Sequence, residues 1–243
     1  MKGRADDRRI FERSIRPNVM SLVDGADFDS DRIIHSVTLA NHGLQPGDLK
    51  DLKALFEHVT TLGSLIQVPE RVIAKLPQLK ALSETSSQDM FVANAIEQMQ
   101  PLVKQAGILA AKYHAVAANP PYMSDKYFTP QFKASIKSSF PESRHNLYSV
   151  FMDRLIDLVM PNGRLGMVTL QSWMSGSKYE AFRQRLLSKH AVANVADLGA
   201  GAFDSIGGQV VSTAMFVLNN LQSPRFRGVY VDLTAVHGEE GKS

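Results

Sequence analysis

The chain has 243 residues, of which 44% are hydrophobic and 21% are charged, and this composition excludes a largely disordered protein. It contains no cysteine, which excludes disulfides, thiolate chemistry and cysteine–zinc sites. The seven histidines are scattered, so the sequence predicts no metal site. A formal net charge of +3 permits a nucleic-acid partner but does not require one.

Targeting signals are not evident in the sequence. No apolar run approaches the ~20 residues that cross a membrane, and residues 1–16 lack the apolar core of a signal peptide. These features favour a cytoplasmic protein without a membrane partner.

Residues 1–110 are expected to hold part of a strand followed by a helical insertion. The short apolar segment 18–23 ends at a turn and predicts a strand. From 46 to 82 the apolar residues recur at spacings of three and four, which predicts helices broken by two prolines. Residues 88–111 predict a second helical stretch, interrupted near Pro101. These helices could pack internally, which we favour, or form a coiled face for a partner.

The remaining chain alternates between strands and helices. We expect strands at 113–118, 165–170, 192–198 and 210–218, helices at 147–159 (with Asn146 as N-cap) and 179–187, a loop at 123–145, and a helix stop at 161–163. This order favours an α/β fold with a partial Rossmann-like sheet, mostly parallel and closed by an antiparallel edge strand. The expected domains are therefore 1–110, a catalytic half at 111–221, and the start of a following segment at 222–243.

The tetrapeptide Asn119-Pro120-Pro121-Tyr122 follows directly after the apolar segment 113–118, which is expected to be a buried strand. A residue before proline favours an extended backbone, so Asn119 should continue the strand, and the two prolines should then fix the turn. Ligands of open α/β sheets bind beyond the carboxyl ends of the strands. The tetrapeptide is therefore predicted to hold one amide and one free carbonyl rigidly at a ligand-binding edge.

Two such acceptors suit the methylation of the adenine amino group, whose lone pair is delocalised into the ring. The Asn119 side-chain oxygen and the Pro120 carbonyl could accept its two N–H bonds and free the lone pair for attack on a methyl sulfonium. Tyr122 would offer its ring face to the base, which must first be flipped out of a duplex. The alternative interpretation is a structural Pro-Pro turn with an asparagine cap and a core tyrosine.

Three segments together resemble the adenine-N6-specific DNA methyltransferases of BREX phage-defence systems. They are YHAVAANPPYM, RHNLYSVFMDRLIDLVMPNGRLGMVTLQSWM and DLGAGAFDSIGGQVVSTAMFVL, and they cover residues 113–218 with two gaps. The resemblance is strong from about residue 110 to residue 220 and weaker before it. It implies a methyltransferase of the restriction-modification or antiviral-defence type that uses S-adenosyl-L-methionine as donor and double-stranded DNA as substrate. Other phage-defence proteins are the further partners that the resemblance implies.

The resemblance also implies roles for particular residues. Asn119 to Tyr122 match the catalytic tetrapeptide, and Phe203 matches an aromatic residue that packs on the flipped base. Leu147 and Tyr148 match a helix start that lines the donor pocket, and Asp24 matches an acidic residue near the adenine of the donor. Simple packing remains the alternative for Phe203, Leu147 and Tyr148.

The Gly-rich donor loop of these methyltransferases is not found before Asn119. Gly199-Ala200-Gly201 is a poor substitute, because neither a long helix nor an acidic strand end follows it. The chain is therefore expected to be a fragment that lacks the donor-binding half. Two other functions stay open: methylation of a protein glutamine, which poses the same problem of a delocalised nitrogen, and a non-catalytic module that binds DNA or a defence partner.

Overall fold

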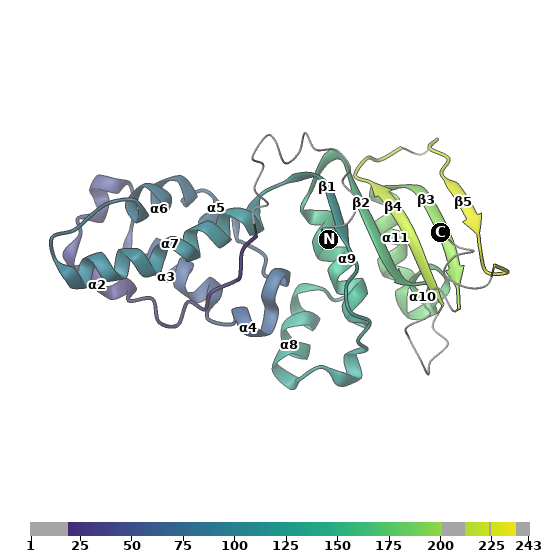
Figure 1. Ribbon diagram of the computed structural model, residues 1–243, viewed down its shortest axis with the longest axis horizontal. Coiled ribbons are helices and arrows are strands. Elements are labelled where there is room, and N and C mark those ends of the chain that lie inside the picture. The colour runs from purple at the N-terminus through teal and green to yellow at the C-terminus, as the bar shows by residue number, and fades with distance from the viewer. Residues whose placement is uncertain (1–18, 201–211, 224, 237–243) are drawn as a thin grey trace, which may run out of the picture.

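The computed structural model describes residues 19–200, 212–223 and 225–236. Helices that precede a five-stranded sheet form one side of the molecule, and the sheet with its own helices forms the other (Figure 1). The α/β class with a preceding helical region, expected from the sequence, is confirmed.

The helical region is built around one long helix, α7 (Met90–Ala110). The shorter elements that precede it are α2 (Ser30–Ser36), η1 (Leu39–His42), α3 (Pro46–Phe56), α4 (Val59–Leu62), η2 (Gly63–Leu65), α5 (Glu70–Ile73) and α6 (Leu76–Ser83). Leu49, Leu52 and Met99 are fully buried in their common apolar core. The predicted internal packing of the helical insertion is therefore the arrangement found.

The interruption predicted near Pro101 is wrong, because α7 continues through this proline. A proline inside a helix loses one main-chain hydrogen bond. Its neighbours Met99, Leu102 and Val103 are buried in the core of the helical region. Burial of the apolar face of α7 therefore outweighs the local cost of the proline.

The strand predicted at 18–23 is also wrong for the described residues 19–23, which form no strand. The main chain at Val23 instead pairs with the side chain of Gln105, which is fully buried on α7. The Gln105 amide accepts from the Val23 N–H at 2.9 Å and donates to the Val23 carbonyl at 2.9 Å. The Gln105 amide therefore forms the two main-chain hydrogen bonds that a neighbouring strand would otherwise form with Val23.

The sheet has the order β1-β2-β4-β3-β5. The strands are β1 (Tyr113–Ala118), β2 (Val159–Leu170), β3 (Ala191–Gly199), β4 (Thr213–Asn219) and β5 (Val229–Asp232). β1 pairs with β2 and β5 with β3 in parallel, whereas β4 runs antiparallel to both of its neighbours. The predicted antiparallel strand is therefore present, but it lies inside the sheet and not at its edge.

Two strands differ from the sequence prediction in their surroundings. β1 was expected to be buried, yet it is an edge of the described sheet, and its residues are exposed or half-buried. β5 lies in the segment 222–243, which was expected to begin a further part of the protein, yet β5 extends this sheet. Residues 210 and 211 of the strand predicted at 210–218 lie outside the described residues. The domain boundaries remain predictions.

Helices α9 (Leu147–Asp157), α10 (Ser172–Ser175) and α11 (Glu180–Lys189) pack against the sheet, and η4 (Ser177–Tyr179) leads into α11. Asn146 caps α9 as predicted, because its side chain accepts from the Tyr148 N–H. The predicted loop at 123–145 instead contains η3 (Asp125–Tyr127) and α8 (Pro130–Ser139). Burial of Phe132 and Ile136 against α9 stabilises α8, although its sequence is mainly polar.

Residues 161–163 were predicted to stop a helix, but α9 already ends at Asp157 and these residues lie within β2. They form an irregular stretch, since the register moves from Tyr113↔Val159 to Ala115↔Arg164. Asn162 has a φ of 65°, and a side chain at Gly163 would come within 2.8 Å of the His114 carbonyl oxygen. Close approach of β1 therefore requires glycine at this position.

Arg154 joins the helical region to the sheet. Its side chain on α9 is buried, and it donates to the carbonyls of Ile66 at 2.9 Å and of Leu109 at 2.8 Å. Burial lowers the pKa of the guanidinium from its ordinary value. Because the two carbonyls belong to the helical region, this contact fixes how that region sits beside α9.

Replacing Arg154 with alanine leaves two carbonyls without their donor. We expect Arg154→Ala to lower the free energy of unfolding by about 1–3 kcal/mol, as measured by urea denaturation. Arg164→Ala, at an exposed position on β2, is the control and should change stability by less than about 0.5 kcal/mol. Equal stability of the two variants would contradict the role assigned to Arg154.

Candidate active site at the end of strand β1

The tetrapeptide Asn119–Tyr122 follows directly after β1. It lies at the end of the sheet where the parallel strands β1 and β2 have their carboxyl ends. Asn119 is exposed and does not turn into the core, whereas Pro120 is buried and anchors the turn. The Tyr122 hydroxyl donates to the Asn119 side-chain oxygen at 3.4 Å, a long contact. Asn119 is therefore exposed, and its side-chain oxygen accepts only this long hydrogen bond among the described residues.

The turn is held against the beginning of α9 by main-chain hydrogen bonds. The Leu147 N–H donates to the Met123 carbonyl at 2.8 Å, and the Asp125 N–H donates to the His145 carbonyl at 3.2 Å. Ser124 also forms an isolated antiparallel bridge with Asn146. These contacts bring the predicted residues Leu147 and Tyr148 next to the tetrapeptide.

An aromatic cluster lies beneath Tyr122. The ring of Tyr148 meets the ring of Tyr122 edge-on, with centroids 6.2 Å apart, and lies 6.1 Å from the ring of Tyr179. The Tyr148 hydroxyl lies 3.0 Å from the hydroxyl of Ser172, the first residue of α10. Tyr148 is fully buried, whereas Tyr122 is half-buried and packs against the same core cluster.

Burial favours the uncharged forms of the aromatic side chains in this cluster. Burial raises the pKa of Tyr122 and that of Tyr148 above the ordinary value of a phenol. Burial, assisted by Arg144 and Lys178, lowers the pKa of His145, whose ring lies 5.9 Å from that of Tyr179. Neutral aromatic groups suit the stacking of an uncharged planar ligand.

Two further predicted residues are not brought to the tetrapeptide by the described structure. Asp24 lies in a turn of the helical region, where its carboxylate accepts from the Ala26 N–H at 2.8 Å. The neighbouring Gly25 N–H donates to the Phe56 carbonyl on α3. Phe203 lies outside the described residues.

Sequence reasoning missed several groups at this edge of the sheet. The buried carboxylate of Asp197, on β3, accepts from the Gln171 side chain, from the Tyr230 hydroxyl at 3.1 Å and from the Gly199 N–H at 3.1 Å. The contact of Tyr148 with Ser172 was missed as well. An acidic residue inside an otherwise apolar strand was the available signal for Asp197.

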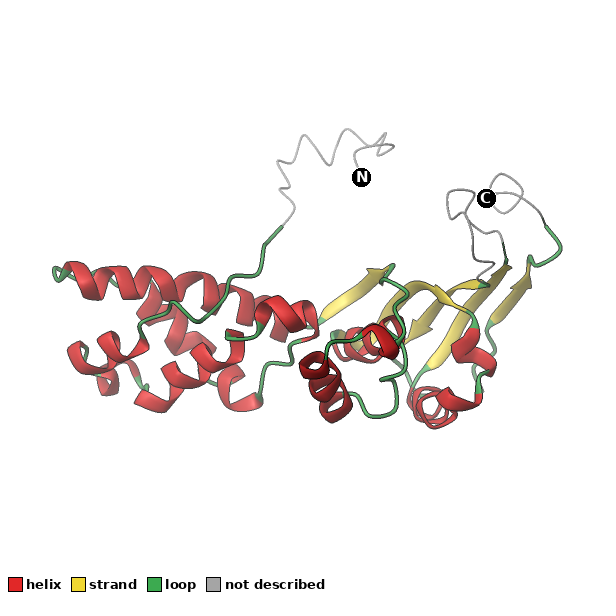
Figure 2. Cartoon of the chain, turned by 90° about the horizontal axis from the view of Figure 1, so that it is seen from below, coloured by secondary structure: helices red, strands yellow, loops and turns green. Residues whose placement is uncertain are grey.

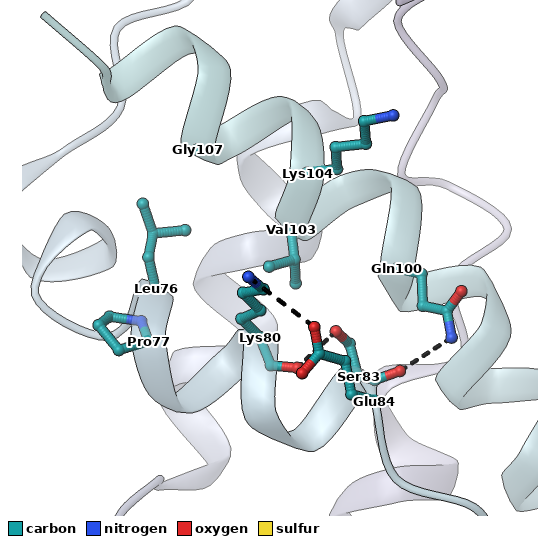
Figure 3. A pocket seen from close by; sticks show the side chains of 9 residues that line it. All are labelled: Leu76, Pro77, Lys80, Ser83, Glu84, Gln100, Val103, Lys104 and Gly107. Carbon is teal, nitrogen blue, oxygen red and sulfur yellow. Dashed lines mark hydrogen bonds and ion pairs between the residues drawn. The ribbon is translucent and has the colours of Figure 1, made fainter.

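A separate groove lies between α6 and α7 (Figure 3). Its volume is about 680 Å³, with Leu76 and Val103 on its apolar side and Lys80 and Lys104 beside them. Lys80 forms a surface ion pair with Glu84 at 3.9 Å. The lining comes from the helical region alone, so this groove is not part of the site at β1.

The model of the Eco57I restriction-modification methylase family matches residues 54–203, which is more than half of the chain and includes the tetrapeptide. This chain belongs to that family. The match joins most of the helical region to the strands β1, β2 and β3. Among the described helices, none combines the length and apolar character needed to cross a membrane.

Two relatives confirm the resemblance to the methyltransferases of BREX systems. The adenine-specific methyltransferase BrxX of Escherichia coli O9:H4 (strain HS) is 35% identical over 266 residues. The adenine-specific methyltransferase PglX of Lacticaseibacillus casei (strain Zhang) is 29% identical over 253 residues. Both matches cover 100% of this chain, but the chain spans only 22% and 20% of the two relatives.

Solved structures are more distant. A chain of the DrdV–DNA complex matches 62% of this chain and 17% of its own length, with 15% identity and a TM-score of 0.46.

The family implies S-adenosylmethionine as the methyl donor, and the sequence assigned three residues to its binding. Leu147 and Tyr148 are buried at the beginning of α9, next to the tetrapeptide. Asp24 is held by contacts within the helical region. The assignment of these three residues to donor binding stays a prediction, and simple packing stays the alternative for the two on α9.

The lowered pKa values of His145 and His190 predict a pH-dependent stability. Their ordinary value is 6.5, and burial is the main cause of both shifts. Between the folded and unfolded pKa values the unfolded chain binds more protons, so stability is lost as the pH falls below about 6.5.

Urea denaturation at about pH 7.5 and about pH 5.5 measures this loss. The double variant His145→Gln/His190→Gln should lose less stability than the wild-type chain between these two pH values. An unchanged loss in the double variant would show that other groups cause the pH dependence.

Proposed function

We propose that this chain provides the base-holding part of an S-adenosylmethionine-dependent methyltransferase that acts on adenine N6 in DNA, in restriction-modification or phage defence. The observation that supports this most directly is the exposed Asn119 amide on a proline-fixed turn at the edge of the sheet. The family of the chain and the names of its two relatives are in agreement with it.

The chemistry that we assign to Asn119 and Pro120 is the grip on the amino group. The Asn119 side-chain oxygen and the Pro120 carbonyl accept the two N–H bonds of the base. Because both acceptors are fixed before the base arrives, they favour the geometry in which the nitrogen lone pair is localised. No carboxylate base is needed for this step. Among the described residues, the Asn119 side-chain oxygen accepts only the long hydrogen bond from the Tyr122 hydroxyl. An N–H of the incoming base can replace that hydroxyl.

Tyr122 is assigned a stacking role in this proposal. Its ring contacts Tyr148 edge-on and is half-buried, and the base would stack on the part of the ring that stays accessible after it is flipped out of the duplex. Stacking on an aromatic ring returns about 1–3 kcal/mol per base, which offsets part of the unstacking cost. Tyr148 is therefore next to the site although it is buried, because its ring contacts the ring of Tyr122.

Loss of the Asn119 amide tests the proposal directly. We expect Asn119→Ala, introduced into the full-length protein, to abolish adenine methylation while the thermal unfolding midpoint stays near that of the wild type, because the side chain is exposed. Genomic adenine methylation in cells that carry the variant is the measurement. Asn41→Ala, at an exposed asparagine of the helical region, is the matched control and should keep methylation. Normal methylation by Asn119→Ala would refute the role of the amide.

Two variants of Tyr122 separate its ring from its hydroxyl. Because stacking needs only the ring, Tyr122→Phe should keep most of the methylation rate, whereas Tyr122→Ala should lose about tenfold or more. Initial rates of tritium transfer to DNA by the full-length protein provide the measurement. If the phenylalanine variant is as impaired as the alanine variant, the hydroxyl matters and the stacking role is wrong.

A further inference from the structure

Tyr127 is an exposed aromatic residue on a fixed piece of main chain, five residues after Tyr122. It is 67% exposed, although its N–H donates to the Ser124 carbonyl at 3.0 Å. The next residue, Phe128, is buried, and its N–H donates to the Asp125 carbonyl at 3.3 Å. The main chain at Tyr127 is therefore fixed on both sides, and its side chain faces solvent.

The short helix η3, which carries Tyr127, is attached to its surroundings at both ends. At its beginning the Asp125 N–H donates to the His145 carbonyl at 3.2 Å, just before α9. At its end the ring of Phe128 meets the ring of Phe132 on α8 edge-on, with centroids 4.8 Å apart. In Figures 1 and 2 the chain leaves the sheet after β1, forms α8 beyond the strands and returns to the sheet in α9. Tyr127 is therefore presented by a rigid projection beside the tetrapeptide.

Tyr127 is close enough to the tetrapeptide to meet a duplex whose adenine enters the site. Five residues span at most about 18 Å when they are fully extended, and the turn of η3 shortens this distance. The major groove of B-DNA alone is about 12 Å wide. A duplex that delivers a base to Asn119 therefore also comes next to the ring of Tyr127.

The segment around Tyr127 carries positive charge that has no partner within the described chain. Its two carboxylates, Asp125 and Glu142, are both in ion pairs with basic side chains. Lys126 and Lys137 are exposed and have no carboxylate partner among the described residues. The Lys126 ammonium lies 4.8 Å from the centroid of the Tyr127 ring. Because such side chains attract phosphates, the surroundings of the exposed ring suit a DNA backbone.

An exposed ring at this place addresses a physical problem of base flipping. When an adenine leaves the duplex, the base pairs on either side lose a stacking partner. A side chain that enters such a step replaces part of the lost stacking. Tyr122 is not available for this task, since the proposed function places it against the flipped base. Phe128, Phe132 and Phe140 of the same segment are buried, whereas the ring of Tyr127 is open.

We propose that Tyr127 enters the duplex beside the flipped adenine and stacks on a base pair that faces the vacated position. This inference rests on the proposed function, because it requires a flipped base. It assigns to Tyr127 the stabilisation of the opened duplex, whereas Asn119 and Pro120 hold the base that has left it. Lys126, beside the ring, meets the phosphate next to the gap.

Two duplexes separate this role from a structural one. Both contain the sequence that the full-length protein methylates, as determined from genomic methylation. In the first the target adenine is paired with thymine, and in the second it faces an abasic site. An unpaired adenine costs less to flip, so its methylation depends less on a side chain that stabilises the opened duplex. Initial rates of tritium transfer to both duplexes are measured for the full-length protein and its variants.

We expect Tyr127→Ala to lower the rate on the paired duplex by about tenfold and the rate on the abasic duplex by less than about threefold. Tyr127→Phe should keep most of both rates, because stacking needs only the ring. Phe91→Ala is the matched control, since Phe91 is 63% exposed in the helical region, and it should change neither rate. The thermal unfolding midpoints of all three variants should stay near that of the wild type, because both side chains are exposed.

The comparison of the two duplexes decides the outcome. An equal loss on both duplexes would show that Tyr127 does not act in opening the duplex and would overturn the proposal. Unchanged rates for Tyr127→Ala on both duplexes would overturn it as well, while the role of Asn119 would stand. Wild-type protein that methylates adenine in neither duplex would instead refute the proposed function, and this inference with it.

Discussion

The hydrogen bond from the Leu147 N–H to the Met123 carbonyl fixes the turn after β1 on the beginning of α9, and the geometry of the site depends on it. Parallel pairing of β1 with β2 sets where Asn119 leaves the sheet, but a strand end alone does not determine where the next four residues lie. The prolines limit the backbone, and the contacts of residues 123–125 with 145–147 remove the remaining freedom. Tyr148 can then support Tyr122 because α9 begins at this point.

Much of this arrangement could be predicted from the sequence, because it depends on local rules. Apolar periodicity located the helices between residues 46 and 110, although it did not indicate α2. The apolar segment 113–118 with the prolines after it located β1 and its turn. Asn146 was recognised as a cap because capping depends on a residue and its immediate neighbours. The exposed position of Asn119 followed from the same kind of local argument.

The features that could not be predicted depend on tertiary contacts. The polar helix α8 exists because Phe132 and Ile136 find an apolar surface on α9, which its own sequence does not reveal. Gln105, which is 82 positions away in the chain, hydrogen-bonds to Val23 where a strand was expected. The antiparallel strand β4 lies between β2 and β3, although it was expected at the edge of the sheet. The carboxylate of Asp197 has one partner on its own strand, Gly199, and two from separate segments, Gln171 and Tyr230, so no single stretch of sequence predicts the cluster.

The central claim is that the Asn119 oxygen and the Pro120 carbonyl together grip an exocyclic amine. It is tested most directly by a structure of the full-length protein bound to a duplex that contains the sequence it methylates, as determined from genomic methylation. The account predicts an adenine outside the helix, with its amino nitrogen within about 3.2 Å of both oxygens and its ring on Tyr122. An extruded adenine whose amino group is held by other residues, or an Asn119 that faces away from it, would contradict the account.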